Sequence, residues 1–514
     1  MTTINLYAAL DIGSNSIKMK VVSVDENNTV STIEELRKNI ALGKDTFNYN
    51  RIRTETMLKL CDTLNDFRKI MDMYQVKNYR AVATSALRES DNRDIVIDLI
   101  KQKTDFEVQL INGAEEKHFT YLALEEKFKA TGDFREDGAV VLDIGAGSVE
   151  VSLFYNNQIQ RTYSIQTGVL RLKEILNDLE RLTIDYPKLL ADFIDAQIFD
   201  VRNDIAGLEI ENFIAIGGEV VQLRQLCTLT GKENGEINRD EFNAIYNDFL
   251  RYPLPKVMRQ YGIRSDNADH FLPTLILIQR FIDMTAAERI ILSNVSLRDG
   301  MVAYDCLISD KNIIARDMLD SAWGIVHKYN GNRKHLSHVC NLAEAIFKEL
   351  KQVSGLNERD KLLLKISSIL HEVGNYISVM DMWKATYDVI MYSDLIGISD
   401  DEVHMIAAIA KYSGEQSPSY RAVADKGFDE KSRIRVKKLS AILSLANAMD
   451  RSKGKKLKLK SVNIKKSELR IKCSSEKETL LEEWEFQRRC ERFYDVFGYK
   501  PKLQCKGDED VVFK

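Results

Sequence analysis

Hydrophobic and polar residues alternate along residues 140–154, VVLDIGAGSVEVSLF, except for a central break from Gly145 to Ser148. Alternation with a period of two predicts β-strands, and the break predicts a tight turn between them. Glycines let main-chain N–H groups face outward, which is the geometry of a phosphate-binding loop. Asp143 and Glu150 flank this loop. Carboxylates repel phosphate unless a hard cation lies between them, so the pair predicts Mg²⁺ or an activated water.

The same pattern occurs a second time. Residues 9–22, ALDIGSNSIKMKVV, match residues 141–154, VLDIGAGSVEVSLF, at a constant offset of 132. A single glycine-rich turn beside acidic residues is common and most only reverse the chain. The repeat instead predicts two related half-domains, each contributing a phosphate loop to a shared cleft.

The region between the two repeats alternates between strand and helix patterns. Residues 55–74 form an amphipathic helix whose apolar face belongs to the core, and a strand follows at 79–84. That strand leads into the polar turn Ser85-Ala86-Leu87-Arg88 and a helix at about 93–103. A guanidinium at the C-terminal end of a strand in a doubly wound sheet is well placed to meet a ligand. A surface charge explains Arg88 equally well, and the sequence leaves both interpretations open.

Two glutamates, Glu115 and Glu116, follow a strand at 107–111 and begin a helix. Acidic residues in a first helical turn complement the helix dipole, which explains the pair without any function. However, a helix N-terminus just beyond a strand also points toward the two phosphate loops. A carboxylate there can orient water toward a bound phosphate.

Residues 155–300 supply the second half-domain. A helix is predicted over 187–208, and the strand NFIAIGG at 212–218 ends in two glycines, which form either a third wall of the cleft or a plain turn. Helices at 239–250 and 274–284 precede a short strand at 289–292. From about Asp310 the chain becomes long amphipathic helices, and its last segment reads as a hairpin, a helix and a strand, which predicts a small α+β tail.

Histidines and acids recur in the helical region. His335 and His338 lie three apart on one helix, His371-Glu372 ends another, and Asp450 ends a third. A lone histidine is usually a core or surface residue. The set His338, His371, Glu372 and Asp450 comes from three elements, and we consider it a candidate metal site in a helical bundle.

Composition narrows the class of protein. The 514 residues suffice for about three domains, and 44% hydrophobic and 29% charged residues are typical of a soluble globular protein. No apolar run reaches the ~20 residues of a membrane span, and no export signal is evident, so we expect no membrane partner. Seven scattered cysteines without CxxC spacing favour a reducing cytoplasm. The net charge of −4 gives no global attraction to polyanions, and we expect no specific nucleic-acid partner.

One segment has the opposite charge. Residues 431–466 contain thirteen Lys and Arg against one acid, Asp450. A dense block of one sign in a net acidic protein is a candidate track for a polyanion, although a solvated face is nearly as plausible an explanation.

Several motifs together resemble a known family. In order and at this spacing, ALDIGSNSIKM, ATSALRES, INGAEE, VLDIGAGSVEV and GVLRL resemble the exopolyphosphatase and guanosine pentaphosphate phosphohydrolase (Ppx/GppA) family of the actin-like, sugar kinase and heat-shock chaperone superfamily. LKISSILHEVGNYIS, YSDLIGIS and LANAMDRS resemble the HD-type helical domain that many members append. The resemblance implies an α/β fold of two actin-like (ribonuclease H-like) half-domains at 1–125 and 126–308 around a cleft. It further implies an HD-like helical domain at 309–455 and a small α+β domain at 456–514.

The resemblance also implies an activity and a site. Family members remove the terminal phosphate of linear polyphosphate or the 5′ phosphate of pppGpp with Mg²⁺, and the family suggests a homodimer. Glu116 would be the catalytic base, and Glu150 the carboxylate that positions metal or water beside Asp143. The implied substrate-binding residues are Asp11, Gly13, Ser14, Asn15, Ser16, Ser85, Arg88, Gly145, Ala146, Gly147 and Ser148.

This chain departs from the family pattern at four places. The second loop usually reads Gly-Gly-Gly-Ser-Thr-Glu, and here Ala146 and Val149 replace a glycine and a threonine. In the helical domain Glu372 replaces the usual aspartate, and a histidine-rich stretch is replaced by VMDMWKATYDV. We therefore expect that the helical domain is not a working metallohydrolase.

The leading interpretation is an exopolyphosphatase. Hydrolysis of pppGpp is the nearest alternative, because both substrates present a terminal phosphoanhydride. An ATP-dependent small-molecule kinase of the same superfamily would need a nucleoside pocket around IAIGG. A sensor of polyphosphate or guanosine tetraphosphate with weak catalysis would fit the altered second loop.

Overall fold

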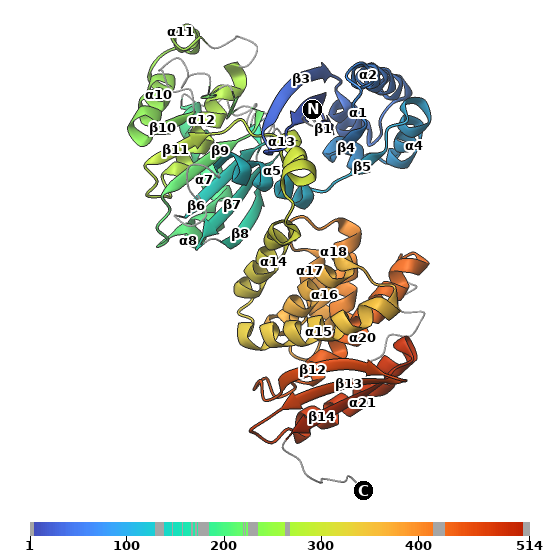
Figure 1. Ribbon diagram of the computed structural model, residues 1–514. Helices are drawn as coiled ribbons and strands as arrows, with labels where there is room; N and C mark the ends of the chain where they lie inside the picture. Colours follow the sequence, from blue (N-terminus) through green and yellow to red (C-terminus); the bar gives the residue numbers. More distant parts are fainter. Residues whose placement is uncertain are drawn as a thin grey trace. The chain divides into compact units, whose positions relative to one another are not determined.

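The computed structural model divides the chain into two compact units, Met1–Asp317 and Met318–Lys514. In Figure 1 the sheets of the first unit run from blue to green and the second unit from yellow to red. The structure describes residues 5–128, 138–145, 148–156, 158–165, 168–169, 172, 185–218, 220–221, 223–224, 235–262, 268–414 and 427–506.

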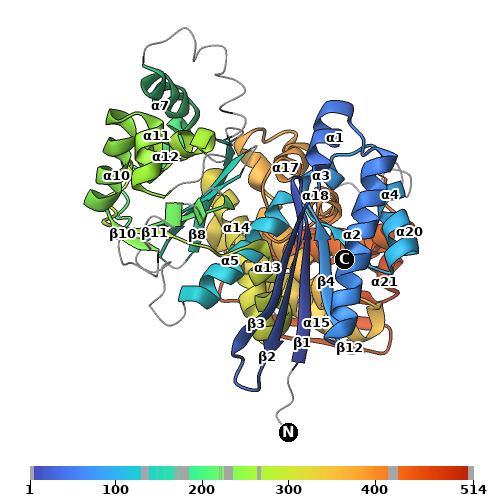
Figure 2. The same cartoon turned by 90° about the horizontal axis from the view of Figure 1, so that it is seen from above.

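A five-stranded sheet opens the first unit, in the order β3-β2-β1-β4-β5. Its strands are β1 (Asn5–Ile12), β2 (Ser16–Val24), β3 (Val30–Asn39), β4 (Asn78–Ala83) and β5 (Val108–Leu110). β1, β2 and β3 pair antiparallel, whereas β4 pairs parallel with β1 and β5 parallel with β4. Figure 2 shows β3, β2, β1 and β4 side by side.

Both faces of β1 are buried. Ala8 and Leu10 belong to a core shared with helices on one face, while Tyr7 and Ala9 belong to a second core on the other face. This division follows from the two-residue period of a strand, and it explains why the segment YAALDI is almost continuously apolar. The helices that follow in this part of the chain are α1 (Leu42–Tyr49), α2 (Thr54–Met73), α3 (Ser85–Arg88), α4 (Arg93–Thr104) and α5 (Gly113–Phe128).

A second sheet repeats the topology of the first, in the order β10-β11-β9-β6-β7-β8. Its strands are β6 (Ala139–Ile144), β7 (Val149–Tyr155), β8 (Gln158–Ile165), β9 (Asn212–Ile216), β10 (Glu236–Asn238) and β11 (Arg289–Leu292). β6, β7 and β8 are antiparallel neighbours, and β9 runs parallel to β6. The predicted pair of related α/β half-domains is therefore confirmed.

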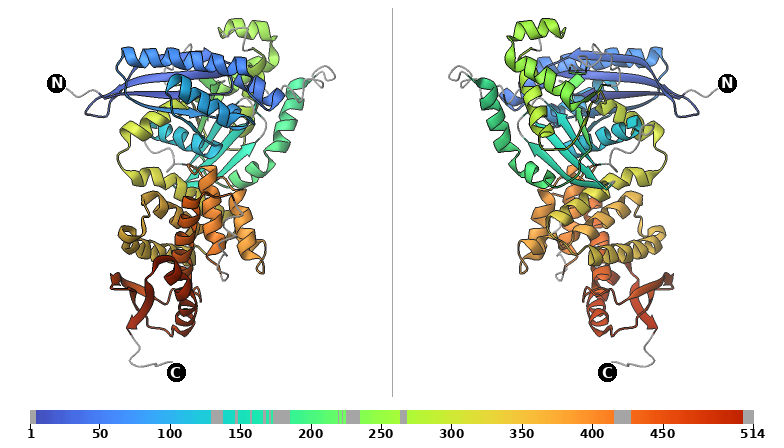
Figure 3. Two further views of the ribbon diagram at one scale, coloured as in Figure 1. Left: turned by 90° about the vertical axis from the view of Figure 1, so that its right-hand side faces the viewer. Right: turned by 90° about the vertical axis from the view of Figure 1, so that its left-hand side faces the viewer.

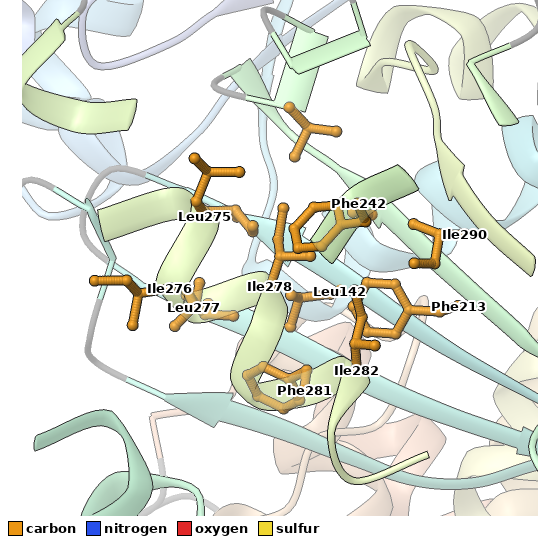
Figure 4. Packing of buried hydrophobic residues seen from close by; sticks show 14 of the residues in the cluster. Leu142, Phe213, Phe242, Leu275, Ile276, Leu277, Ile278, Phe281, Ile282 and Ile290 are labelled. Carbon is orange, nitrogen blue, oxygen red and sulfur yellow. The ribbon is translucent and has the colours of Figure 1, made fainter. Parts of the chain in front are cut away.

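Helices pack on the second sheet. They are α7 (Tyr186–Gln197), α8 (Phe199–Ile205), α10 (Arg239–Arg251), α11 (Leu254–Gln260) and α12 (Ala268–Ile282). The single helix predicted over 187–208 is wrong: it is broken at Ile198, whose side chain is fully buried in the core. In Figure 4, Ile278 and Ile282 of α12 lie near Leu142 and Phe213 of the sheet. α12 is apolar on most sides because it is a buried helix.

The chain then returns to the first sheet. α13 (Leu297–Val302) and the π-helical turn Ala303–Leu307 follow β11, and Met301 and Val302 share a core cluster with Tyr7 of β1 and Phe119 of α5. Gly300 makes the closest approach, because a Cβ there would lie 1.9 Å from the carbonyl oxygen of Phe119. Only a glycine lets α13 contact the α5 backbone this closely.

Replacing Gly300 with alanine is expected to destabilise the protein by about 3 kcal/mol, because the new methyl group meets rigid backbone. Gly113→Ala is the matched control, since a Cβ at Gly113 would meet nothing within 4 Å. Chemical unfolding monitored by circular dichroism measures both. Equal stability of the two variants would contradict the packing described for α13.

The second unit is helical and ends in a small sheet. Its helices are α14 (Lys311–Lys328), which begins in the first unit, α15 (Arg333–Ser354), α16 (Glu358–Leu370), the 3-10 turn Val373–Tyr376, α17 (Met382–Met391), α18 (Asp400–Tyr412) and α20 (Glu430–Ala448). The sheet comprises β12 (Lys458–Lys465), β13 (Glu468–Ser474) and β14 (Lys500–Lys506), with α21 (Leu480–Phe497) beside it. Figure 3 shows this red helix next to the red strands. The predicted helical region and α+β tail are both confirmed.

Among the described residues, no helix combines the length and the apolar character that a membrane crossing needs. None of the cysteines in the described ranges forms a disulfide.

Candidate functional site

Equivalent main-chain hydrogen bonds close the two predicted phosphate loops. Gly13 N donates to Ser16 O at 3.2 Å, and 132 residues later Gly145 N donates to Ser148 O at 2.9 Å. A Cβ on either glycine would lie 3.2 Å or 3.0 Å from that same carbonyl oxygen, so both turns favour glycine by close contact. Ala146 and Gly147, at the tip of the second loop, lie outside the described residues.

The first loop is held by neighbouring segments. The Ser14 hydroxyl lies 2.9 Å from the Ser85 hydroxyl at the start of α3, which brings these two predicted substrate-binding residues together. Gly43 N donates to Ser14 O at 2.8 Å, and Ile40 N donates to Asn15 O at 3.1 Å. The backbone carbonyls of Ser14 and Asn15 therefore accept hydrogen bonds from neighbouring main-chain N–H groups, while the Asn15 side chain remains exposed.

A further glycine lies against the second loop. Gly217, at the end of β9, has a φ of +120°, and a Cβ there would lie 2.3 Å from Ile144 O. This close approach explains why a glycine is required here, and a third wall of the cleft at this point stays a prediction. The end of β9 closes directly against the strand that leads into Gly145.

The two hairpins differ in the charge of the residue that pairs with the loop aspartate. Asp143 pairs in register with Glu150 across β6 and β7, whereas Asp11 pairs with Lys18 across β1 and β2. The Lys18 ammonium lies 3.5 Å from the Asp11 carboxylate. The repeat therefore carries two acids in its second copy, but an acid and a base in its first. Lys18 was not singled out by sequence reasoning, although its alignment with Glu150 in the repeat was a usable signal.

Asp143 lies in a crowded acidic environment. Burial and, secondarily, the charge of Glu150 raise its pKa to about 6, although Lys117 opposes the shift. Two carboxylates on adjacent strands supply the oxygen donors that Mg²⁺ prefers, and a divalent cation would relieve their repulsion. The residues present therefore fit the ion that the sequence predicts.

Glu150 already has two partners. The Lys117 ammonium from α5 lies 2.7 Å from one carboxylate oxygen, and the Ser164 hydroxyl of β8 donates to the other at 2.6 Å. Lys117 is only 6% exposed, which is unusual for a lysine. The N-terminal part of α5 is thereby joined to the second sheet, and Glu150 is held in one orientation. Sequence reasoning missed Lys117, because a lysine near the start of a helix is ordinarily a surface residue.

The two glutamates at the start of α5 have different surroundings. Glu115 caps the helix: it accepts from Asn112 N at 3.1 Å, and its own N–H donates to Asn112 Oδ1 at 2.9 Å. Glu116 instead lies within electrostatic reach of both Asp11 and Asp143. Burial is the main cause that raises the pKa of Glu116 to about 7, and the two aspartates add to the shift.

Arg88 contacts Glu116. Its guanidinium lies 3.2 Å from a Glu116 oxygen and donates to Ile111 O at 2.6 Å, and its charge lowers the pKa of Glu116 against the effect of burial. Of the two interpretations of Arg88, the structure thus favours the one that places it with the other predicted site residues.

Replacing Arg88 with methionine should raise the pKa of Glu116 further, because the positive charge of Arg88 lowers that pKa in the parent protein. If the deprotonated Glu116 drives catalysis, the acidic limb of the pH–rate profile should move to higher pH. Arg88→Lys, which keeps the charge, should move it less. An unchanged limb in the methionine variant would show that this limb does not report Glu116.

In the second unit the structure corrects the predicted set of histidines. The donor atoms of His335, His371 and Glu372 lie within 4.8 Å of one another, and this is the only such group found among the described residues. His335 rather than His338 joins it. The two histidines lie three residues apart on α15, and the face that carries His335 is the one directed at His371. Asp450 belongs to the same cluster through a 2.8 Å contact with His335 Nδ1.

The basic segment 431–466 is partly neutralised. Lys453 pairs with Glu372 at 2.6 Å, Lys456 with Glu482 at 3.4 Å, and Arg435 with Asp360 at 2.6 Å. These partners lie outside the segment, which is why the sequence block overstates the free positive charge. A polyanion track along it stays a prediction.

Two family models match the chain. The model described as the Ppx/GppA phosphatase family matches residues 20–308, and the model described as Ppx/GppA phosphatase, domain III, matches residues 319–488. Together they cover both units of the structure.

Individual proteins give the same result. A guanosine-5′-triphosphate,3′-diphosphate pyrophosphatase of Photobacterium profundum is 24% identical over 421 residues, 80% of this chain and 81% of its own. A bifunctional 3-dehydroquinate synthase/phosphatase of Fusobacterium nucleatum is 31% identical over 175 residues, 33% of this chain and 26% of its own. Among solved structures, the Aquifex aeolicus Ppx/GppA family member has a TM-score of 0.51 at 20% identity, covering 59% of this chain and 98% of its own. This structural likeness establishes the fold.

Proposed function

The chain belongs to the Ppx/GppA phosphatase family, and from this premise we propose that it hydrolyses the terminal phosphoanhydride of inorganic polyphosphate and releases orthophosphate. The observation that carries the proposal is the position of Glu116. It is a carboxylate with a pKa of about 7, it contacts Arg88, and it lies within electrostatic reach of the aspartates that begin both phosphate loops.

Glu116 is suited to act as a general base. A base works best when its pKa is close to the working pH, and near neutral pH a substantial fraction of Glu116 is ionised. In the proposed reaction a water oxygen bonds to the terminal phosphorus, and its proton passes to Glu116. The bond from that phosphorus to the bridging oxygen breaks, and the shortened chain leaves with the electron pair.

The loops provide binding groups for the phosphate chain. The hydroxyls of Ser14 and Ser85, which lie 2.9 Å apart, are the kind of donor that holds phosphate oxygens. Arg88 adds a positive charge with several N–H donors. The two loops, related by the internal repeat, would bind successive phosphates from either side.

Asp143 and Glu150 would hold Mg²⁺. When bound there, the ion would neutralise charge on the phosphate oxygens and lower their repulsion from the surrounding carboxylates. Glu150 enters such a site already oriented by Lys117 and Ser164.

Hydrolysis of pppGpp is a second candidate with its own support. The Photobacterium relative, aligned over about four fifths of both chains, is named for action on guanosine-5′-triphosphate,3′-diphosphate. Removal of its 5′-terminal phosphate breaks the same type of bond, so the residues described above serve either substrate.

Phosphate release from polyphosphate of defined length and from pppGpp, each with and without Mg²⁺, tests the proposal. A higher kcat/KM for polyphosphate supports exopolyphosphatase activity, and a higher value for pppGpp supports the second candidate. Tight binding of either compound with negligible release would overturn both in favour of a sensor with weak catalysis.

A further inference from the structure

Two cysteines lie side by side in the small sheet of the second unit. Cys473 of β13 and Cys505 of β14 are register partners on parallel strands. Register partners point to the same face of a sheet, because side chains alternate with a period of two along each strand. The shared face is the buried one: Cys473 is buried and Cys505 half-buried, whereas Lys472 and Gln504, the residues before them, are exposed. Both cysteines carry thiols rather than a disulfide.

The spacing of these two residues suits a disulfide. Neighbouring strands lie about 4.8 Å apart, and the two Cα atoms of a disulfide are usually roughly 4.4 to 6.8 Å apart. The thiols also influence each other: burial and, secondarily, the charge of Cys505 raise the pKa of Cys473 to about 12. Among the cysteines in the described ranges, strand register brings together only this pair.

Cys505 is the more accessible of the two thiols. β14 is an outer strand of the three-stranded sheet, and Cys505 is its last residue but one (Figure 1). The end of an outer strand is held by hydrogen bonds on one side only, so it opens more readily than the interior of a sheet. Opening of this end exposes the thiol of Cys505 first and then the thiol of Cys473.

We propose that Cys473 and Cys505 form a reversible disulfide when the protein meets a small-molecule disulfide of the glutathione type. The thiolate of Cys505 attacks one sulfur of that molecule, which leaves a mixed disulfide on Cys505 and releases one small thiol. The thiolate of Cys473 then attacks the sulfur of Cys505, and the second small thiol leaves. The two cysteines lose two electrons and two protons in all, and the small disulfide takes up both.

The burial of Cys473 limits the second step. A thiol with a pKa of about 12 is almost entirely protonated near neutral pH, and only a thiolate attacks a disulfide. The bond therefore closes only while the end of β14 is open. We expect closure to take on the order of minutes to hours and to become faster as the pH rises.

The bond encloses α21 in a covalent loop, because residues 473–505 contain the whole of that helix. Glu482 of α21 accepts from Ser452 N at 3.1 Å and lies 3.4 Å from Lys456 Nζ, so the helix is also bound to the segment that follows α20. A cross-link stabilises a protein mainly by restricting its unfolded chain. The oxidised second unit should therefore melt about 5 to 10 °C higher than the reduced one.

Incubation of the native full chain with oxidised glutathione, followed by blocking of the remaining thiols and peptide mapping by mass spectrometry, tests the proposal. The parent protein should yield two linked peptides that contain Cys473 and Cys505, and dithiothreitol should separate them. The melting temperature of the same samples should rise with oxidation and fall back on reduction. Cys505→Ser, a small change at a half-buried strand end, should show neither the link nor the rise, and reversal by dithiothreitol needs no variant at all.

Cys490→Ala is the matched control. Cys490 belongs to α21, but its Sγ lies 3.7 Å from Pro501 O, and Pro501 is about 13 Å along β14 from Cys505. This variant should therefore form the link as the parent does. Three results would overturn the proposal: no link between Cys473 and Cys505 in the native parent, a link to Cys490 instead, or a mixed disulfide that persists on Cys505. A link without a rise in melting temperature would overturn its stabilising effect.

Discussion

Replacing Glu116 with glutamine is expected to slow phosphate release by about 10²- to 10⁴-fold while substrate binding is largely retained. Glutamine keeps the shape of the side chain and still accepts a hydrogen bond from Arg88, but it cannot take up a proton. Rates under saturating substrate measure the loss. Equilibrium binding of polyphosphate, measured separately, shows whether the site remains intact.

The neighbouring residue provides the control. Glu115→Gln removes a charge from the same helical turn, but Glu115 caps the helix and should change the rate only a few-fold. If Glu116→Gln also stayed within a few-fold of the parent, Glu116 would not be the base.

The pH dependence of stability gives an independent readout for Glu116. Its pKa in the folded protein, about 7, lies above the ordinary value of 4.5, so the fold disfavours the ionised form. Its stability contribution is therefore fully present below about pH 4.5 and lost as the pH rises through about 7. The glutamine side chain does not titrate, so Glu116→Gln does not lose this stability as the pH rises. Its melting temperature at pH 8 should therefore be no lower than that of the parent.

The fold and the loops could be predicted because their signals are local in sequence. The two hairpins are each a continuous segment of alternating residues, and their repetition at an offset of 132 makes the paired sheets evident. The helices of the second unit likewise follow from their apolar periodicity. The break at Ile198 escaped notice because periodicity on both sides of it is helical.

The contacts that complete the site are not local, and this is why they escaped notice. Lys117 and Glu150 lie 33 residues apart and come from different elements, and nothing in the segment GAEEKHF marks its lysine as buried. The choice between His335 and His338 depends on which side of α15 faces α16, a matter of packing. Likewise, carboxylates remote in sequence neutralise the basic segment.

Lys117→Met is expected to lower kcat by about 10- to 100-fold, because Glu150 loses the partner that orients it. The same change should make Mg²⁺ bind more tightly. The ammonium and the metal compete for one carboxylate, and Lys117 also lowers the pKa of Asp143, so its removal leaves an uncompensated acidic pair. A lower kcat together with a lower half-saturating Mg²⁺ concentration is therefore the distinguishing result.

Thermal unfolding separates this role of Lys117 from a purely structural one. Without Mg²⁺ the methionine variant should melt below the parent, because a buried charge pair has been broken, and added Mg²⁺ should restore more stability to the variant than to the parent. Lys127→Met is the matched control: Lys127 lies on the same helix and also reaches the second half of the unit, through Ser293 and Asn294, but it contacts neither carboxylate. Its loss should leave the Mg²⁺ requirement unchanged. If Lys117→Met and Lys127→Met responded alike to Mg²⁺, Lys117 would serve only to join α5 to the second sheet.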